Sequence, residues 1–207
     1  MLRSLVGSEM CIRDRAKVVA DLLAARPGLR IAAFGGPQLR AAGAQLLFDM
    51  TTFSAVGIVE ILSAYPFYRR LFNRMVDWTL QWKPKVVVLV DYPGLNLRLA
   101  NELRKAGLSR AGFGGTAVIQ YVSPQLWAWK PKRRFTMARD LDSVGTIFPF
   151  EPACYADTKL DARFVGHPFV DKEHVPGLRH DPDGPVLLLP GSRPKPVRKI
   201  FPALVEA

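Results

Sequence analysis

The sequence has few cysteines and no long apolar run. Its 207 residues include two cysteines, Cys11 and Cys154, too few for a disulfide framework or a cysteine metal cluster. This usage is typical of a reducing compartment. No apolar run reaches the roughly 18 residues of a membrane-spanning helix, so no transmembrane segment is predicted. Residues 1–15 also lack the continuous apolar stretch of a secretory signal peptide.

Acidic residues are scarce relative to basic ones. Lysine and arginine number 29 against 18 aspartates and glutamates, which gives a formal net charge of +11. Hydrophobic residues make up 49% of the chain, enough to build a core, and this excludes intrinsic disorder. The basic excess alone is equally compatible with nucleic acid, anionic lipid or a phosphorylated substrate as the partner.

Short apolar runs alternate with helical patterns along the chain. The aliphatic run at residues 85–91 predicts a strand buried on both faces, as in a parallel sheet. The other predicted strands are residues 29–34, 117–122, 143–148, 164–166 and 185–189. The predicted helices are residues 16–26, 65–82, 96–105 and 132–141, with others starting near 38 and 194. This alternation predicts an α/β fold with a Rossmann-like, doubly wound parallel sheet.

A change of composition divides the chain near its end. Residues 171–185 contain four acidic residues, three prolines and two glycines, and we interpret them as a linker. Residues 16–170 then form a Rossmann-like domain, and residues 186–207 begin a second one. Residues 1–15 fit neither a strand nor a helix, and we interpret them as a non-native leader. The chain resembles one cut at both ends.

In doubly wound sheets, ligands bind beyond the carboxyl ends of the strands. Asp91 ends the predicted strand 85–91, where a carboxylate is placed to act as general base toward a hydroxyl. The alternative is a structural turn, with Asn96 as the N-cap of the next helix. Trp127 and Trp129 follow the strand 117–122 and either stack on a ligand or pack a loop against the core.

Two further positions are candidates for ligand contact. His167, in a Gly-His-Pro sequence, is either an acid, base or ligand contact or a structural histidine. Gly191, Ser192 and Arg193 follow the strand predicted at 185–189 and open a helix. Free backbone N–H groups and an arginine fork there suit a phosphate, although an ordinary strand–helix turn has the same pattern.

Residues 56–72 contain more apolar surface than one core-facing stripe requires, with Arg69, Arg70 and Arg74 beside it. This combination suits an anionic membrane surface or a groove for acyl chains. The alternative is a thick buried helix. The candidate membrane- or acyl-facing residues are Ile61, Leu62, Tyr65, Phe67, Tyr68, Leu71 and Phe72.

Several segments, taken together in their order and spacing, resemble the lipid-A-disaccharide synthase family from about residue 16 to residue 207. The most specific are Ser123-Pro124 with Trp127-Ala128-Trp129, and Leu189-Pro190-Gly191-Ser192-Arg193. The others lie at residues 34–37, 41–43, 55–60, 91–96, 121–122, 148–151 and 164–168. Members of this family are inverting glycosyltransferases of the GT-B type, with two Rossmann-like domains.

The resemblance implies a reaction that joins UDP-2,3-diacylglucosamine to 2,3-diacylglucosamine 1-phosphate and releases UDP. By the same resemblance, Asp91 and Arg193 match essential residues, the first a base for the acceptor hydroxyl and the second acting on phosphate charge. It implies no metal and no cofactor, and a location at the cytoplasmic face of a Gram-negative-type inner membrane, whose surface is anionic. The implied substrate contacts are Asn96, Ser123, Trp127, Trp129, His167, Gly191 and Ser192.

The sequence departs from the family pattern in two places. Residues 1–15 stand where the family has a strand and a Gly-Glu-x-Ser-Gly-Asp loop, and Gly94 with Leu95 replaces the commoner Asp-Phe, so a second carboxylate is lost. Most of the second domain, which would hold the nucleotide in this fold, is also absent, and for that reason we expect the chain by itself to be inactive. The alternatives are another GT-B sugar-nucleotide enzyme, such as a related transferase or an epimerase, an inactive pseudo-domain, and a basic nucleic-acid-binding module. The scattered cations and the lack of a nucleic-acid motif disfavour the last.

Overall fold

The computed structural model describes residues 9–50, 58–167, 170, 184–190 and 194–206. The chain divides into two compact units, Met1–Asp171 and Lys172–Ala207, and each is considered by itself. The helices of the first unit are α1 (Glu9–Ala25), α2 (Pro37–Ala41), α3 (Ile58–Trp82), α4 (Pro93–Lys105) and α5 (Arg133–Asp140), with short 3-10 turns η1 (Arg110–Gly112) and η2 (Glu151–Tyr155). Its strands are β1 (Ala32–Gly35), β2 (Gln45–Asp49), β3 (Val86–Val90), β4 (Ala117–Tyr121), β5 (Ser143–Thr146) and β6 (Asp161–Phe164).

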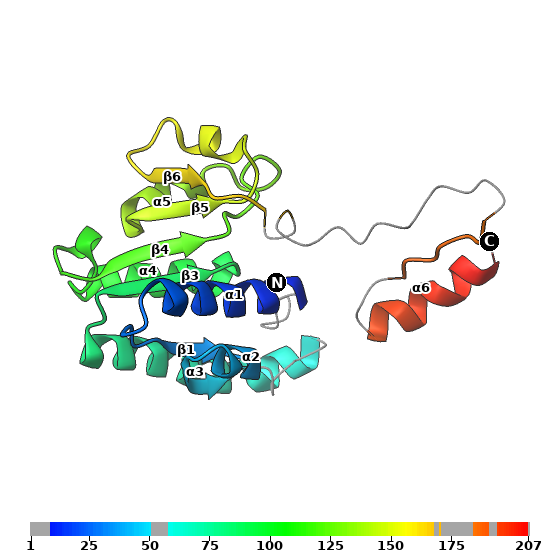
Figure 1. Cartoon of the computed structure of the whole chain (residues 1–207), viewed down its shortest axis with the longest axis horizontal. Coiled ribbons are helices and arrows are strands. Elements are labelled where there is room, and N and C mark those ends of the chain that lie inside the picture. Colours follow the sequence, from blue (N-terminus) through cyan, green and yellow to red (C-terminus); the bar gives the residue numbers. More distant parts are fainter. Residues whose placement is uncertain (1–8, 51–57, 168–169, 171–183, 191–193, 207) are drawn as a thin grey trace. The chain divides into compact units, whose positions relative to one another are not determined.

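All strand pairs in the first unit are parallel, which confirms the predicted α/β class (Figure 1). The strands form two sheets among the described residues, one of order β1-β2 and one of order β3-β4-β5-β6. A single doubly wound sheet was expected, whereas here β1 and β3 each pair on one side only. Helices α2, α4 and α5 provide the crossovers from β1 to β2, from β3 to β4 and from β4 to β5, as the alternating sequence pattern requires, and α3 links β2 to β3.

Two predicted strands and one helix start differ from the observed ones, and one observed strand was not predicted. Helix α1 begins at Glu9, so the expectation that residues 1–15 fit no helix is wrong for the described residues 9–15. The structure adds β2, which no prediction covered, and it places β6 at Asp161–Phe164 rather than at residues 164–166. In the second unit, residues 184–190 carry no strand, contrary to the prediction for residues 185–189. A strand needs a hydrogen-bonded neighbour, and the described part of this unit, which otherwise holds α6 (Pro194–Glu206), supplies none.

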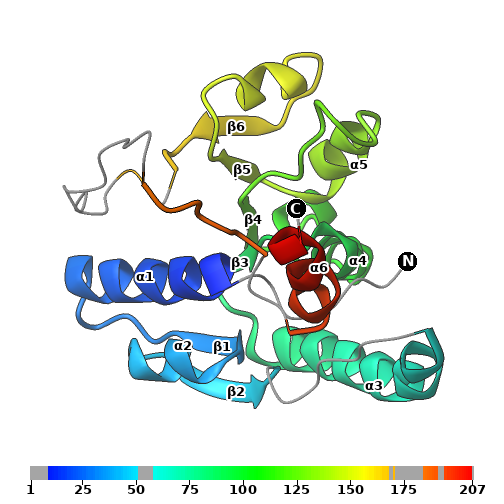
Figure 2. The same ribbon diagram turned by 90° about the vertical axis from the view of Figure 1, so that its right-hand side faces the viewer.

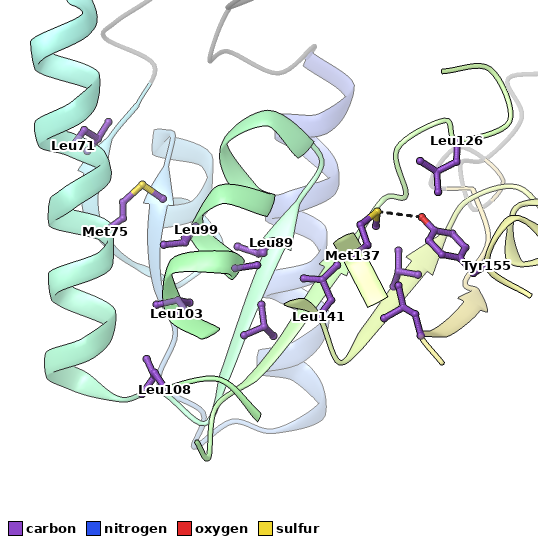
Figure 3. Packing of buried hydrophobic residues seen from close by; sticks show 14 residues of the cluster. Leu71, Met75, Leu89, Leu99, Leu103, Leu108, Leu126, Met137, Leu141 and Tyr155 are labelled. Carbon is purple, nitrogen blue, oxygen red and sulfur yellow. Dashed lines mark hydrogen bonds between the residues drawn. The ribbon is translucent and has the colours of Figure 1, made fainter. Parts of the chain in front are cut away.

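The main core lies between the four-stranded sheet and the helices α3, α4 and α5 (Figure 3). Leu103, Val118 and Met137, from a helix, a strand and a helix, are completely buried in it. Figure 2 shows the other end of the unit, where α1 and α2 lie beside the β1-β2 sheet. A smaller cluster of Val19, Leu39 and Ala44 holds that part together.

The two faces of β3 differ in burial. Leu89 is buried and Val87 packs against the main core, but Val86 and Val88 on the opposite face are 47% and 42% exposed. The prediction of a strand buried on both faces is therefore wrong. Alternate residues of a strand point to opposite faces, so an all-aliphatic sequence does not reveal that only one face is covered.

A buried carboxylate ties α4 to α5. Asp140 is 1% exposed, and its Oδ1 accepts hydrogen bonds from Arg104 Nε at 2.7 Å and from Arg139 Nε at 2.8 Å. The side chain of Arg104 is 26% exposed and that of Arg139 is 54% exposed, so the pair with Arg104 is the more desolvated of the two. A pair removed from water in this way is costly to break, because the remaining charge loses its partner.

We expect Asp140→Ala to lower the free energy of unfolding by about 2 kcal/mol, because Arg104 keeps its charge and loses its carboxylate. Asp140→Asn should cost about half as much, since an amide oxygen still accepts one hydrogen bond. Urea unfolding followed by circular dichroism measures both. The control is Asp21→Ala, which breaks the exposed Lys17–Asp21 pair of 2.8 Å and should cost about 0.5 kcal/mol or less. Equal losses for Asp140→Ala and Asp21→Ala would contradict the expectation.

Candidate functional site

The carboxyl ends of β3, β4, β5 and β6 lie along one edge of the sheet, which we call the carboxyl edge, because these strands are parallel. Backbone hydrogen bonding continues one residue past β3 and β6 and two residues past β4. Asp91 N donates to Tyr121 O at 2.9 Å, Ser123 N to Gly145 O at 3.1 Å, and Val165 N to Thr146 O at 2.9 Å. The candidate residues Asp91, Ser123 and His167 therefore leave the sheet on the same side.

The chain turns sharply after β3. Asp91 and Tyr92 have left-handed backbone conformations, with φ of 52° and 38°, and α4 begins at Pro93 with Tyr92 as its N-cap. This corrects the alternative in which Asn96 caps the helix. Asn96 is 8% exposed and lies inside α4, and its Nδ2 donates to the carbonyl oxygens of Val90 and Asp91. Its amide nitrogen thus stabilises the turn itself.

Sequence reasoning missed Gln120, the second amide at this turn. Its side chain is completely buried in β4, and its Nε2 lies 2.9 Å from Asp91 O and 3.1 Å from Val122 O. Val122, like Asp91, is left-handed, with φ of 67°. A single polar residue in the apolar run 117–122 is the signal in the sequence that identifies it.

Ser123 is a core residue rather than an exposed one. It is 6% exposed, and its Oγ lies 2.8 Å from the hydroxyl of Tyr155 and donates to Pro124 O at 3.0 Å. The Tyr155 hydroxyl also contacts Met137 Sδ at 3.6 Å, drawn as the dashed line in Figure 3. Burial raises the pKa of Tyr155 to about 12, against a smaller lowering by the Ser123 hydrogen bond. The Ser123 hydroxyl therefore takes part in a buried hydrogen-bond pair with Tyr155.

Aromatic side chains line the carboxyl edge beyond β4, β5 and β6. The rings of Phe148 and Phe150 stack at 5.6 Å, Trp127 meets Phe150 edge-on at 5.7 Å, and His167 lies 5.7 Å from Phe148. We call these four residues the aromatic ledge. Trp127 is 53% exposed and Phe150 51%, so the ledge offers two ring surfaces to a ligand.

Trp129, the other predicted tryptophan, lies farther along the same loop. It is 66% exposed, and Lys130 Nζ stands 5.5 Å from the centre of its ring. Its exposure argues against the alternative in which both tryptophans pack the loop onto the core. That packing role belongs to Leu126, which is 3% exposed.

A buried glutamate shapes the loop beneath the ledge. Glu151 is 1% exposed, and its Oε2 accepts hydrogen bonds from the backbone N–H groups of Ile147 and Phe148, both at 3.1 Å. These are the first two residues after β5. The carboxylate therefore fixes the backbone of Phe148, from which the ring extends into the ledge.

Some apolar residues of α3 are buried in the core and others are exposed to solvent. Leu71 is 6% exposed in the main core, which corrects its prediction as a membrane- or acyl-facing residue, and the partly buried Phe67 and Phe72 pack against that core. Tyr65 is 56% exposed, and Tyr68 is half-buried. The pKa of Tyr92 is raised, chiefly by burial and secondly by Tyr68, so this part of α3 lies near the turn after β3.

Other predicted residues lie outside the described residues. These are Gly191, Ser192 and Arg193, and for Ile61 and Leu62 the side chains. Among the described residues, no group of three or more histidine, cysteine, aspartate or glutamate side chains is placed to hold a metal ion. No helix within the described ranges has the length and apolarity that crossing a membrane requires.

Comparison with known proteins identifies one family. The family model described as lipid-A-disaccharide synthetase matches residues 13–207 of this chain. That match covers every candidate site residue described above.

Individual relatives carry the same description. The chain is 35% identical to lipid-A-disaccharide synthase 1 of Legionella pneumophila strain Paris, over 97% of this chain and 53% of the relative. It is 38% identical to lipid-A-disaccharide synthase of Myxococcus xanthus, over 93% of this chain and 50% of the relative. The Coxiella burnetii strain Dugway protein of that name is 32% identical, over 93% and 51%. The chain spans about half the length of the curated relatives it matches.

The raised pKa of Tyr155 predicts a loss of stability at alkaline pH. The unfolded tyrosine ionises near pH 10 and the folded one near pH 12, so between these values the unfolded state holds fewer protons. The stabilisation from the neutral phenol is complete below pH 10 and is lost as pH rises toward 12. We expect the free energy of unfolding to fall by roughly 1 kcal/mol between pH 10 and pH 11 from this residue.

Urea unfolding of the native chain and of Tyr155→Phe at several pH values measures this contribution as a difference. Ser123→Ala is the matched control, because it removes the same hydrogen bond and leaves the buried phenol in place. Both variants should lose about 1 kcal/mol at pH 7. Only Tyr155→Phe should lose the alkaline slope. An unchanged slope in Tyr155→Phe would show that Tyr155 does not cause it.

Proposed function

This chain belongs to the lipid-A-disaccharide synthetase family, and we propose on that basis that it forms the acceptor-binding half of an inverting glycosyltransferase. The reaction joins UDP-2,3-diacylglucosamine to 2,3-diacylglucosamine 1-phosphate, with release of UDP. The domain boundaries follow from this proposal. Residues 16–170 bind the acceptor, residues 171–185 link the domains, and residues 186–207 begin the nucleotide-sugar domain.

The observation that carries the proposal is the position of Asp91. It is the first residue after β3 at the carboxyl edge, the side on which parallel sheets bind ligands. Its carboxylate takes the proton of the acceptor's primary hydroxyl as that oxygen bonds to the anomeric carbon of the donor. The bond from that carbon to the diphosphate breaks on the opposite face, UDP leaves with the electron pair, and the configuration inverts.

Binding of the sugars is assigned to the exposed part of the carboxyl edge. Trp127 and Trp129 present ring surfaces on which the apolar face of a sugar or an acyl chain packs. His167, beside Phe148, contacts a substrate hydroxyl or phosphate at the far end of the aromatic ledge. Arg193, with the backbone N–H groups of Gly191 and Ser192, holds the phosphate charge that grows as UDP departs.

The decisive test is turnover in a fusion of this chain with the second half of the Myxococcus xanthus relative. The fusion should form the disaccharide from the two diacylated sugars, and Asp91→Asn should lower kcat by roughly 100-fold or more, because an amide accepts no proton. Product is measured by mass spectrometry. The 207-residue chain alone should form none.

Two controls define the specificity. Sugars without acyl chains should not be used, and Asp161→Asn, an exposed carboxylate on β6, should leave kcat within about twofold. A folded fusion that prefers unacylated sugar nucleotides would favour a related GT-B enzyme instead. Full turnover by Asp91→Asn would remove the aspartate from the mechanism.

We propose further that the protein associates with an anionic membrane surface through α3. Tyr65 is 56% exposed, and Arg69, Arg70 and Arg74 are exposed in the following turns. An exposed aromatic ring among arginines favours the interface of an anionic bilayer. The proposal places the enzyme at the cytoplasmic face of the inner membrane, where acylated substrates reside.

We expect the chain to sediment with phosphatidylglycerol vesicles and not with phosphatidylcholine vesicles, and salt should weaken the binding. The double substitution Arg69→Glu with Arg70→Glu should reduce binding roughly tenfold or more, since each arginine contributes about 1 kcal/mol and reversal adds repulsion. The control pair Arg110→Glu with Lys159→Glu makes the same charge change at exposed positions on η1 and before β6. Equal losses for both pairs would mean that net charge, and not α3, drives the binding.

A further inference from the structure

We infer that Gln120 is a positioning residue that holds Asp91 in its working orientation. The inference rests on the proposed function, because it concerns the same carboxylate. Gln120 lies in β4, whereas Asp91 follows β3, so the two are 29 positions apart in sequence and adjacent across the sheet. The side chain has no place in the proposed chemistry and is completely buried.

The amide of Gln120 is directed at the two chain reversals that end β3 and β4. Its Nε2 lies 2.9 Å from Asp91 O, 3.1 Å from Val122 O and 3.4 Å from Tyr121 O. Two N–H groups are thus shared among three carbonyl oxygens. The opposite orientation of the amide would bring its own oxygen against these acceptors, so the acceptors fix the orientation.

The reversals that it joins are strained. Left-handed backbone is unfavourable for residues other than glycine, and a β-branched valine adopts it rarely. Asp91, Tyr92 and Val122 all adopt it, whereas the nearby Gly94 does not have a positive φ. Such strain persists only where surrounding contacts impose it, and it concentrates at functional sites. Hydrogen bonds from Gln120, together with those from Asn96, are the contacts that impose it here.

The consequence concerns where the Asp91 carboxylate points. Rotation of the peptide after Asp91 would release the strain and re-aim its side chain, and small misplacements of a catalytic group are costly. Gln120 prevents this rotation by fixing the carbonyl oxygen of that peptide. Substitution of a residue that only filled the core would lower stability and leave the orientation of the Asp91 side chain unchanged.

The test uses Gln120→Leu and Gln120→Met, which keep the volume and remove both donors. The matched control is Thr116→Val, directly before β4, which removes another hydrogen bond of a buried side chain, from Thr116 Oγ1 to Pro84 O at 2.8 Å. In the 207-residue chain, NMR coupling constants and carbon shifts of Asp91 and Tyr92 report their φ angles. We expect both Gln120 variants to lose the left-handed signature and Thr116→Val to keep it.

In the fusion enzyme, the Gln120 variants should lower kcat roughly 10- to 100-fold, with KM for the acceptor within about twofold. Thr116→Val should change kcat less than about twofold. If either folded Gln120 variant keeps the native signature and kcat, the inference is overturned while the proposed function stands. If Asp91→Asn retains turnover, the assignment of Asp91 as the base fails and the inference falls with it, whereas a fusion that forms no disaccharide counts against the proposed function itself.

Discussion

Carbonyl groups at the ends of parallel strands need hydrogen-bond donors once the ladder stops, and this requirement shapes the carboxyl edge. Past β3 and β4 the chain reverses through left-handed residues, which leaves the carbonyl oxygens of Val90, Asp91 and Val122 directed inward. Buried carbonyls without donors are costly. Asn96 from α4 and Gln120 from β4 supply the donors, so one helix and one strand jointly fix the turn that carries Asp91.

The strand β4 organises both halves of this edge. Gln120 reaches sideways to the turn after β3, and Ser123, three residues later, reaches the Tyr155 hydroxyl in η2. Glu151, at the start of η2, in turn holds the backbone of Phe148. Buried polar contacts made by β4 and the segments next to it therefore connect the Asp91 turn to the aromatic ledge. The distance between the turn and the ledge is set by the sheet.

Much of this arrangement was predictable from local pattern. Periodicity identified the four crossover-linked strands at residues 86–164 to within a few residues, and the parallel class then directed attention to Asp91 and the tryptophans. The strand Gln45–Asp49 was missed because five residues after a short helix give little pattern of their own and depend on pairing with β1. The partners of Gln120 were not predictable, since they depend on register between strands and on backbone reversals.

The α3 stretch shows where composition stops being informative. An apolar sequence on its own is compatible with an exposed membrane-facing patch. In the structure, however, the helix directs Phe67, Leu71 and Phe72 toward the main core, and it leaves Tyr65 and the arginines exposed. Helical period alone assigns a face but not what covers it. Tyr68, half-buried on α3, contributes to the raised pKa of Tyr92, so this residue of α3 lies near the turn after β3. Under the proposed membrane association through α3, an acylated acceptor would present its hydroxyl to the proposed base Asp91 while its chains remain in the bilayer.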